Sequence, residues 1–222
     1  MATTVKELFE HLVHVGHNTS RWNPKMHSYL YGKRNGVHIF DLEKTLAALE
    51  KVQSFLKTVK AQGGKVLFVG TKPQAAFIIQ ELVKENPRFF YIDENWSPGF
   101  LTNFHELRKR ADYYLNLKSQ FESGEIRKYT KKEIARFQKE LDKLDKVYHG
   151  VAELRRKPDV IIVLDSVSNR LAIEEANITK IPVIAIVDSN ADPDGIDYPI
   201  PANDDSVKSI RFLVKSMLES LE

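Results

Sequence analysis

The sequence predicts an α/β fold, in which a parallel sheet is covered by helices on both faces and an antiparallel helical hairpin protrudes. Apolar runs such as 65–70 and 182–187 are too short for helices and are typical of buried strands. Amphipathic helical stretches alternate with these runs, which is the order expected of a parallel sheet. Between residues 104 and 157 this alternation stops, and apolar residues at helical spacing predict the hairpin.

The N-terminal part begins with a helix and an irregular arm. Apolar residues three and four apart predict a helix over 4–15, which Gly16 should end. Residues 16–36 show no period, and about twenty irregular residues inside a compact domain are usually functional. Further along, strands are predicted at 37–40, 65–70 and 89–92, and helices at 42–62 and 74–84.

Two amphipathic stretches predict the hairpin, whose helices should pair as in a coiled coil. The apolar residues of the first are Phe104, Leu107, Ala111, Tyr114 and Phe121, and those of the second are Ile134, Phe137, Leu141, Leu144, Tyr148 and Val151. Ser123-Gly124 ends the first stretch, and Thr130 with Glu133 predicts a capping box at the start of the second. Each arm of roughly 18 residues would be about 27 Å long.

The alternation of strands and helices resumes after the hairpin. Strands are predicted at 159–164, 182–187 and 198–200, and helices at 169–177 and 204–221, the last capped by Asn203 or Asp204. We therefore expect residues 1–103 and 158–222 to form one α/β domain. In this division, residues 104–157 are an inserted hairpin and residues 16–36 are an N-terminal arm.

The composition excludes several classes of protein. A chain of 222 residues that is 42% hydrophobic and 28% charged is typical of globular proteins. It contains no cysteine, which excludes a disulfide framework, a thiolate zinc site and a cysteine nucleophile. No stretch approaches the ~20 apolar residues that span a bilayer, and residues 1–10 lack the apolar core of a signal peptide. We expect a cytoplasmic protein without a membrane anchor.

The charge is distributed unevenly along the chain. Residues 1–104 carry a net charge of +4, residues 105–157 carry +6 and residues 158–222 carry −7, within a total of +3. This asymmetry predicts one basic and one acidic surface. A basic surface attracts polyanions through counterion release, although ordinary solvated faces would also explain the pattern.

Motifs for nucleotide binding or catalysis are missing. The strand at 65–70 leads into Thr71-Lys-Pro-Gln74, which completes neither the dinucleotide fingerprint nor the P-loop. Lys72 could still contact a phosphate of a larger ligand. His11, His14 and His17 lie three apart, but Gly16 interrupts the helix that would align them around zinc.

Acidic residues gather after the last predicted strands and raise the question of a metal site. Asp188, Asn190 and Asp192 match the first ligands of a calcium loop, but Pro193 and Pro199 occupy the positions that need glycine and glutamate. Turns and a helix cap explain these residues more simply. The weak candidates for a bound magnesium ion are Asp188, Asp204 and Asp205.

The arm interleaves cations with aromatic residues. The cations are Arg21, Lys25, Lys33 and Arg34, and the aromatic residues are Trp22, Tyr29 and Tyr31. Lysine and arginine contact phosphates, while aromatic rings stack on unpaired bases. The alternative is that the arm packs Trp22 and Met26 on the core, and both explanations can hold together.

Several blocks together resemble the small-subunit ribosomal protein S-two family of bacterial type. The blocks are His14-Val-Gly-His17, Trp22-Asn-Pro-Lys-Met26, Val37-His-Ile-Phe-Asp-Leu-Glu-Lys-Thr45, Val66-Leu-Phe-Val-Gly-Thr-Lys72, Trp96, Gly99, Leu101-Thr-Asn103, Pro158-Asp159, Ile181-Pro-Val-Ile-Ala-Ile-Val-Asp188, Asp192-Pro-Asp194, Ile200-Pro201 and Asn203-Asp-Asp205. They follow one another in order from about residue 8 to residue 212.

The resemblance implies a Rossmann- or flavodoxin-like domain with a protruding coiled-coil hairpin. It also implies a structural role in the bacterial small ribosomal subunit, in contact with its rRNA and near the large mRNA-binding protein S-one. Catalysis is not implied, and we expect no cofactor beyond a weakly bound magnesium ion. We also expect no homo-oligomer.

Charge and position give the candidate rRNA contacts. They are Arg21, Trp22, Asn23, Lys25, Lys33, Arg34, Lys72, Asn103, Arg108, Lys109, Arg110, Arg127, Lys128, Lys131 and Lys132. Arginine should form paired hydrogen bonds to phosphate, and lysine should act as a point charge. The alternative function is a metal-dependent enzyme that uses the acidic residues at the edge of the sheet.

Overall fold

The main sheet has five parallel strands. The structure is a computed structural model that describes residues 3–84, 86 and 89–221. The strand order is β5-β4-β6-β7-β8, namely Phe89–Ile92, Val66–Val69, Val160–Val163, Val183–Val187 and Tyr198–Pro201. Numbered along the chain, this is the 2-1-3-4-5 order of flavodoxin-like folds. The predicted α/β fold is confirmed.

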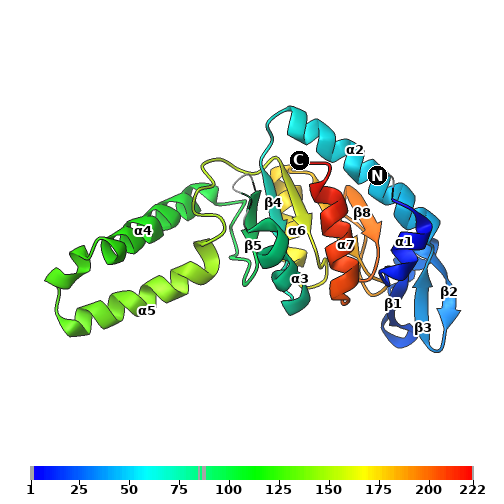
Figure 1. Ribbon diagram of the computed structural model, residues 1–222, viewed down its shortest axis with the longest axis horizontal. Coiled ribbons are helices and arrows are strands. Elements are labelled where there is room, and N and C mark those ends of the chain that lie inside the picture. Colours follow the sequence, from blue (N-terminus) through cyan, green and yellow to red (C-terminus); the bar gives the residue numbers. More distant parts are fainter. Residues whose placement is uncertain (1–2, 85, 87–88, 222) are drawn as a thin grey trace.

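Helices cover both faces of this sheet (Figure 1). The helices α2 (Leu42–Ala61), α3 (Pro73–Ile78) and α7 (Val207–Leu218) pack on one face, and α6 (Arg170–Thr179) packs on the other. Val66 and Phe68 of β4 belong to the first core, and Leu67 and Val69 belong to the second. Successive side chains of a strand point to opposite faces, so both faces of the sheet are buried.

Three helices differ clearly from their predicted bounds. The helix predicted over 4–15 ends at Glu10, because Leu12 has a φ of 61° and turns the chain; Gly16 lies in a strand, so the prediction that it ends the helix is wrong. The helix α3 ends at Ile78 and continues as a π-helix, η3 (Ile79–Val83). The helix α7 begins at Val207 with Ser206 as its N-cap, so the predicted start at residue 204 and the predicted caps are wrong. Instead, Asn203 Oδ1 accepts hydrogen bonds from the backbone N–H groups of Asp205 and Ser206, at 2.9 and 3.1 Å. This local turn delays the helix.

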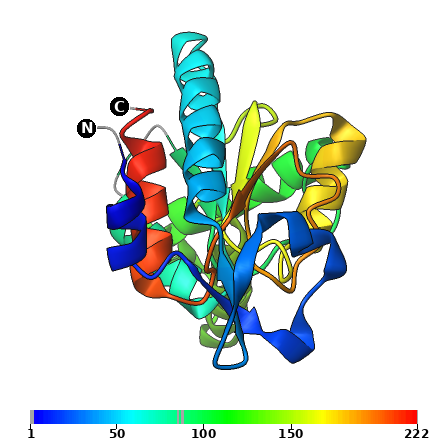
Figure 2. The ribbon, with the colours of Figure 1, turned by 90° about the vertical axis from the view of Figure 1, so that its right-hand side faces the viewer.

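The arm is regular, which corrects the prediction of an irregular segment. The helix α1 (Val5–Glu10) is short, and the arm continues through β1 (Val15–Asn18), η1 (Thr19–Arg21), η2 (Pro24–Tyr29) and β2 (Leu30–Arg34). With β3 (Val37–Phe40) these strands form an antiparallel sheet in the order β1-β3-β2 (Figure 2). The turn between β2 and β3 is Asn35-Gly36, and both residues have positive φ. Asn-Gly is a strong hairpin signal that the apolar pattern does not reveal.

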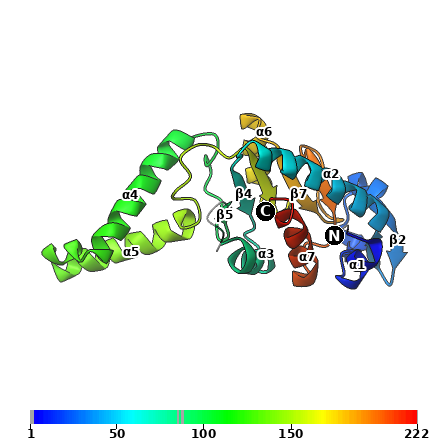
Figure 3. The same ribbon diagram turned by 45° about the horizontal axis from the view of Figure 1, so that its top comes forward.

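The helical hairpin projects from the body of the molecule (Figures 1 and 3). It consists of α4 (Phe104–Glu122), the short 3-10 helix η4 (Glu125–Lys128) and α5 (Lys131–Tyr148). The capping box is present, because Thr130 Oγ1 accepts from Glu133 N and the Glu133 carboxylate accepts from Thr130 N. The first helix buries much of its predicted seam, while in the second helix Tyr148 is the buried residue. None of the described helices is long and apolar enough to cross a membrane.

Candidate nucleic-acid interface

One face of α5 carries a line of cations, which we call the hairpin stripe. Its residues are Lys132, Arg136, Lys139 and Lys143. Spacings of four, three and four place them on one side of the helix, over about 17 Å. They are exposed and line a hollow of about 680 Å³ together with Ala135 and Glu140. No acid of the described part of the chain lies within ion-pair distance of the four cations. Four like charges so close together repel each other unless an anion neutralises them.

The sequence analysis named only Lys132 of this stripe. The predicted cations of the hairpin are all neighbours in the sequence, whereas Arg136, Lys139 and Lys143 are separated by two or three residues. Their spacing along a predicted helix is the signal that would have found them.

A second hollow lies at the base of the hairpin. It has a volume of about 390 Å³, and its lining includes Asn103 and Arg110 with Pro98, Gly99 and Tyr148. The sequence predicted Asn103 and Arg110 as separate contacts, and the fold brings them together. Arg110 is exposed and forms no ion pair with a described residue, so its guanidinium is available to a ligand.

The other predicted cations of the hairpin differ in availability. Arg127 and Lys131 are exposed and unpaired among the described residues, while Lys109 and Lys128 form exposed ion pairs with Glu106 and Glu125, both at 2.7 Å. Exposed pairs of this kind contribute little stability and exchange easily. Arg108 is different, because its side chain is 12% exposed and donates to the carbonyl oxygens of Ala152 (2.6 Å) and Leu154 (3.2 Å). It ties the base of α4 to the segment that follows α5.

All four predicted cations of the arm are exposed, but one of them forms ion pairs. Arg21, Lys33 and Arg34 are exposed and form no ion pair with described residues. Lys25 Nζ lies 2.8 Å from Asp192 and 2.5 Å from Asp194. This pairing holds the arm on the acidic loop.

Two further predicted contacts of the arm have structural partners. The Trp22 ring packs 5.1 Å from the His38 ring and 6.3 Å from the His27 ring. Asn23 N donates to Ser189 O at 2.8 Å, and Asn23 Oδ1 accepts from Lys25 N at 3.0 Å. The exposed cations of the arm and those of the hairpin lie at opposite ends of the long axis (Figure 1). They form two separate basic surfaces, whereas the sequence analysis expected one.

The acidic residues gather at the carboxyl ends of the parallel strands, around one lysine. Lys72 Nζ lies 3.0 Å from Asp204, 2.6 Å from Asp205 and 3.7 Å from Asp165. We call Asp165, Asp188, Asp204 and Asp205 the acidic cluster. Lys72 is therefore enclosed by carboxylates, and we do not include it among the exposed cations.

His17 of the arm closes the acidic cluster from the other side. Its Nδ1 lies 3.0 Å from Asp188 Oδ1 and its Nε2 lies 3.2 Å from Asp205 Oδ2. The hydrogen bond with Asp188 raises the pKa of His17, although burial lowers it in part. Burial also lowers the pKa of Lys72, but Asp205 and Asp204 more than compensate and the net shift is upward. The acidic cluster thus holds cations that belong to the chain itself.

The same cluster contains the weak metal candidates. One ligand atom from each of His17, Asp204 and Asp205 falls within 4.8 Å of the others. Asp188 instead accepts hydrogen bonds from the backbone N–H groups of His17 and Asp204, at 3.2 and 3.3 Å. A magnesium ion prefers a shell of oxygen ligands, including water. The Lys72 ammonium already lies between two of these carboxylates, so the fit is poor.

Two buried carboxylates that the sequence analysis missed connect the hairpin to the sheet. Glu175 of α6 accepts hydrogen bonds from Trp96 Nε1, Gly99 N, Leu101 N and Thr102 N, at 2.8 to 3.2 Å. Burial raises the pKa of Glu175, but these donors lower it by more. The pKa therefore lies below its ordinary value, and the carboxyl stays ionised. They fix the loop that leads into α4.

The second buried carboxylate is Asp93, directly after β5. His149 Nε2 lies 2.9 Å from Asp93 Oδ1, and Gln80 Nε2 donates to Asp93 Oδ2 at 3.0 Å. Burial raises the pKa of Asp93, but His149 and Gln80 lower it to below its ordinary value. This pair joins the end of α5 to the sheet.

We expect the free energy of unfolding to fall as the pH rises from about 6 to about 8. The hydrogen bond with Asp93 raises the pKa of His149, and the hydrogen bond with Asp188 raises the pKa of His17. Burial beside Asp188 and Asp165 raises the pKa of Asp204. The folded chain therefore binds more protons at these three groups than the unfolded chain, and their contribution is lost as the pH rises through the folded pKa values.

Urea unfolding at about pH 6 and at about pH 8 measures this change in the free energy of unfolding. The lowered pKa of His14, which burial causes, opposes the trend, so His14→Gln should make the pH dependence steeper. Asp204→Asn should make it shallower. A protein that becomes more stable between these pH values would contradict the assignment.

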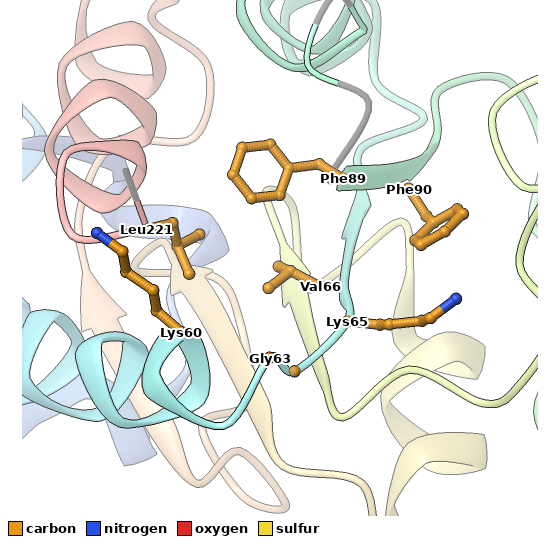
Figure 4. Close-up of a pocket in the computed structure, with 8 residues that line it drawn as sticks. Lys60, Gly63, Lys65, Val66, Phe89, Phe90 and Leu221 are labelled. Atoms are coloured by element: carbon orange, nitrogen blue, oxygen red, sulfur yellow. The ribbon is translucent and has the colours of Figure 1, made fainter.

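A cavity at the opposite edge of the sheet does not form a nucleotide site. It has a volume of about 390 Å³, and Lys60, Lys65, Phe89, Phe90 and Leu221 are among its lining residues. Figure 4 shows the Lys60 and Lys65 side chains extending in different directions, with Lys65 Nζ 5.0 Å from the centre of the Phe90 ring. It lies at the amino ends of β4 and β5, whereas ligands of such sheets bind beyond the carboxyl ends.

Fold and surface together define a class of protein: a flavodoxin-like domain that carries a basic helical hairpin and no nucleotide cradle in its described part. Comparison with known proteins gives the family. The family model described as Ribosomal protein S2 matches residues 8–222. The chain belongs to this family of structural, non-enzymatic ribosomal proteins, so the alternative of a metal-dependent enzyme is wrong.

Two bacterial relatives have the name Small ribosomal subunit protein uS2. The protein of Dehalococcoides mccartyi is 43% identical over 219 residues, which cover 99% of this chain and 89% of the relative. The protein of Coprothermobacter proteolyticus is 44% identical over 218 residues, which cover 98% of this chain and 81% of the relative. Bacterial ribosomal proteins work in the cytoplasm, as the sequence analysis expected for this chain.

Proposed function

We propose that the protein binds the rRNA of the small ribosomal subunit through its two basic surfaces. One surface comprises the hairpin stripe, the hollow at Asn103 and Arg110, and the exposed cations Arg127 and Lys131 near the turn of the hairpin. The other comprises Arg21, Lys33 and Arg34 of the arm. The observation that carries the proposal is the hairpin stripe, where four exposed cations lie on one helix face and only one carboxylate, that of Glu140, shares the hollow that they line.

The expected mode of binding is recognition of shape and phosphate pattern. Arginine forms paired hydrogen bonds with phosphate, and lysine contributes a mobile point charge. Contacts with the sugar-phosphate backbone fix position and carry little base specificity. The buried anchors Glu175 and Asp93 support this mode, because they hold the hairpin at a defined angle to the sheet.

Co-sedimentation tests the proposal. The labelled protein is mixed with large subunits and with small subunits from which the endogenous copy has been stripped, and the mixture is separated on a sucrose gradient. We expect the labelled protein to migrate with the small subunit and to be released at high salt, because each phosphate contact displaces counterions. Migration with the large subunit, or with neither, would contradict the proposal.

We also propose that the acidic cluster needs no metal cofactor. Lys72 already supplies a positive charge between Asp204 and Asp205. We therefore expect calorimetric titration with millimolar magnesium to give no saturable heat, while Lys72→Met should gain a weak site. Saturable magnesium binding by the unaltered protein would overturn this view.

Family membership also supports a proposal about protein neighbours. We propose one copy per small subunit, without homo-oligomer formation, and a position near the large mRNA-binding protein S-one. Cross-linking of purified small subunits, followed by identification of the linked chains, tests both statements.

A further inference from the structure

The edge strand β2 contains a β-bulge at Tyr31. Leu30 pairs with Phe40 and Gly32 pairs with Ile39, so β2 advances by two residues while β3 advances by one. Tyr31 is the extra residue and has no partner across the strand pair. Bulges of this kind redirect a side chain and are enriched near functional sites. Here the bulge directs Tyr31 into solvent, and the residue is 82% exposed.

The surroundings of Tyr31 leave its ring accessible. A Cβ atom added at Gly32 would meet nothing within 4 Å apart from its chain neighbours, so no other part of the described chain covers the strand at this residue. Lys33 and Arg34 follow directly and are exposed, without ion pairs to described residues. No ring contact involves Tyr31 among the described residues.

The other aromatic residues of the arm have packing partners, although Trp22 is still 37% exposed. Trp22 lies against His27 and His38, and Tyr29 is half-buried against the second core. Tyr31 also has the highest exposed fraction of the large apolar residues in the described part of the chain. Because Tyr31 has no packing partner among the described residues, both faces of its ring are free to contact a ligand.

We propose that Tyr31 is a platform on which an unpaired rRNA base stacks, while Lys33 and Arg34 contact the adjacent phosphates. This inference rests on the proposed function and refines it. Duplex RNA offers phosphates but no free base face, so the tyrosine requires an unpaired nucleotide. Stacking of a base on an aromatic side chain tolerates any sequence, and loss of the ring reduces affinity about tenfold or more.

Binding of two labelled RNAs tests the inference. The probes are a single-stranded oligoadenosine of about twelve nucleotides and an RNA duplex of the same length, measured by fluorescence anisotropy with the full-length protein. We expect Tyr31→Ala to weaken single-strand binding about tenfold and to leave duplex binding within about twofold. Tyr31→Phe keeps the ring and should bind as the unaltered protein does.

A control variant and the outcomes separate the two claims. Ile178→Ala removes a side chain that is 72% exposed on α6, and it should change neither affinity. If the unaltered protein binds neither RNA, the proposed function fails. If it binds both RNAs and Tyr31→Ala changes neither affinity, the stacking inference alone is overturned. The same holds if Tyr31→Phe binds the single strand as weakly as Tyr31→Ala does. Equal weakening of single-strand and duplex binding by Tyr31→Ala would also overturn it, because the ring would then not select an unpaired base.

Discussion

Replacing Glu175 with alanine should lower the free energy of unfolding by about 3 kcal/mol or more. The carboxylate of Glu175 is buried and accepts hydrogen bonds from four N–H groups, those of Trp96 Nε1, Gly99, Leu101 and Thr102. Alanine would leave these donors without an acceptor. Each buried unsatisfied group costs about 1–3 kcal/mol, and water entering the gap would recover part of this.

Urea unfolding near neutral pH measures the loss. In a Trp22→Phe background, the fluorescence of Trp96 reports on the loop itself. The matched control is Glu174→Ala, because Glu174 is exposed and pairs with Arg170 at 2.8 Å. That change should stay within about 0.5 kcal/mol. Equal stability of the two variants would show that Glu175 does not hold the loop.

The pKa of Glu175 gives this prediction a dependence on pH. Because the folded carboxyl has a lowered pKa, its stabilising effect is present above the unfolded pKa and is lost as the pH falls through the folded pKa. The difference between the unaltered protein and Glu175→Ala should therefore shrink in acid.

Reversing the charges of the hairpin stripe should reduce affinity for small-subunit rRNA by about 100-fold at moderate salt. The variant carries Arg136→Glu, Lys139→Glu and Lys143→Glu. Three phosphate contacts would be lost and three repulsive charges gained. The slope of log affinity against log salt should become shallower by roughly two to three, because fewer counterions are released. Filter binding at several salt concentrations measures both quantities.

The outer face of α2 offers a matched control for this variant. Lys51→Glu, Lys57→Glu and Lys60→Glu change the net charge equally, and these lysines are exposed and form no ion pair with described residues. This triple variant should lose far less affinity. Equal losses would mean that net charge governs binding and that the hairpin has no special part in it.

Local patterns along the chain predicted much of the fold. Buried strands such as β4 and β7 are recognisable as apolar runs. The helices of the hairpin are recognisable from apolar residues three and four apart and from the Thr130–Glu133 capping box. The strand β3 was predicted at 37–40, but the antiparallel sheet around it was missed because β1 and β2 are short and polar. Its Asn35-Gly36 turn was the available signal.

The sites depend on contacts between distant parts of the chain, which no local pattern contains. Lys72 pairs with Asp204, 132 residues away, and Lys25 pairs with Asp192, 167 residues away. Glu175 binds a loop more than seventy residues earlier. In the sequence these lysines look like any exposed cation, and only the fold separates them from the cations that remain free for RNA.

Ultraviolet cross-linking of purified small subunits tests the central claim most directly. Mass spectrometry of the nucleotide-linked peptides would show which surfaces face the rRNA. We expect linked peptides from the arm, residues 19–36, and from the hairpin, residues 104–148. Linked peptides from the acidic cluster or from α2, with none from the hairpin, would contradict the account.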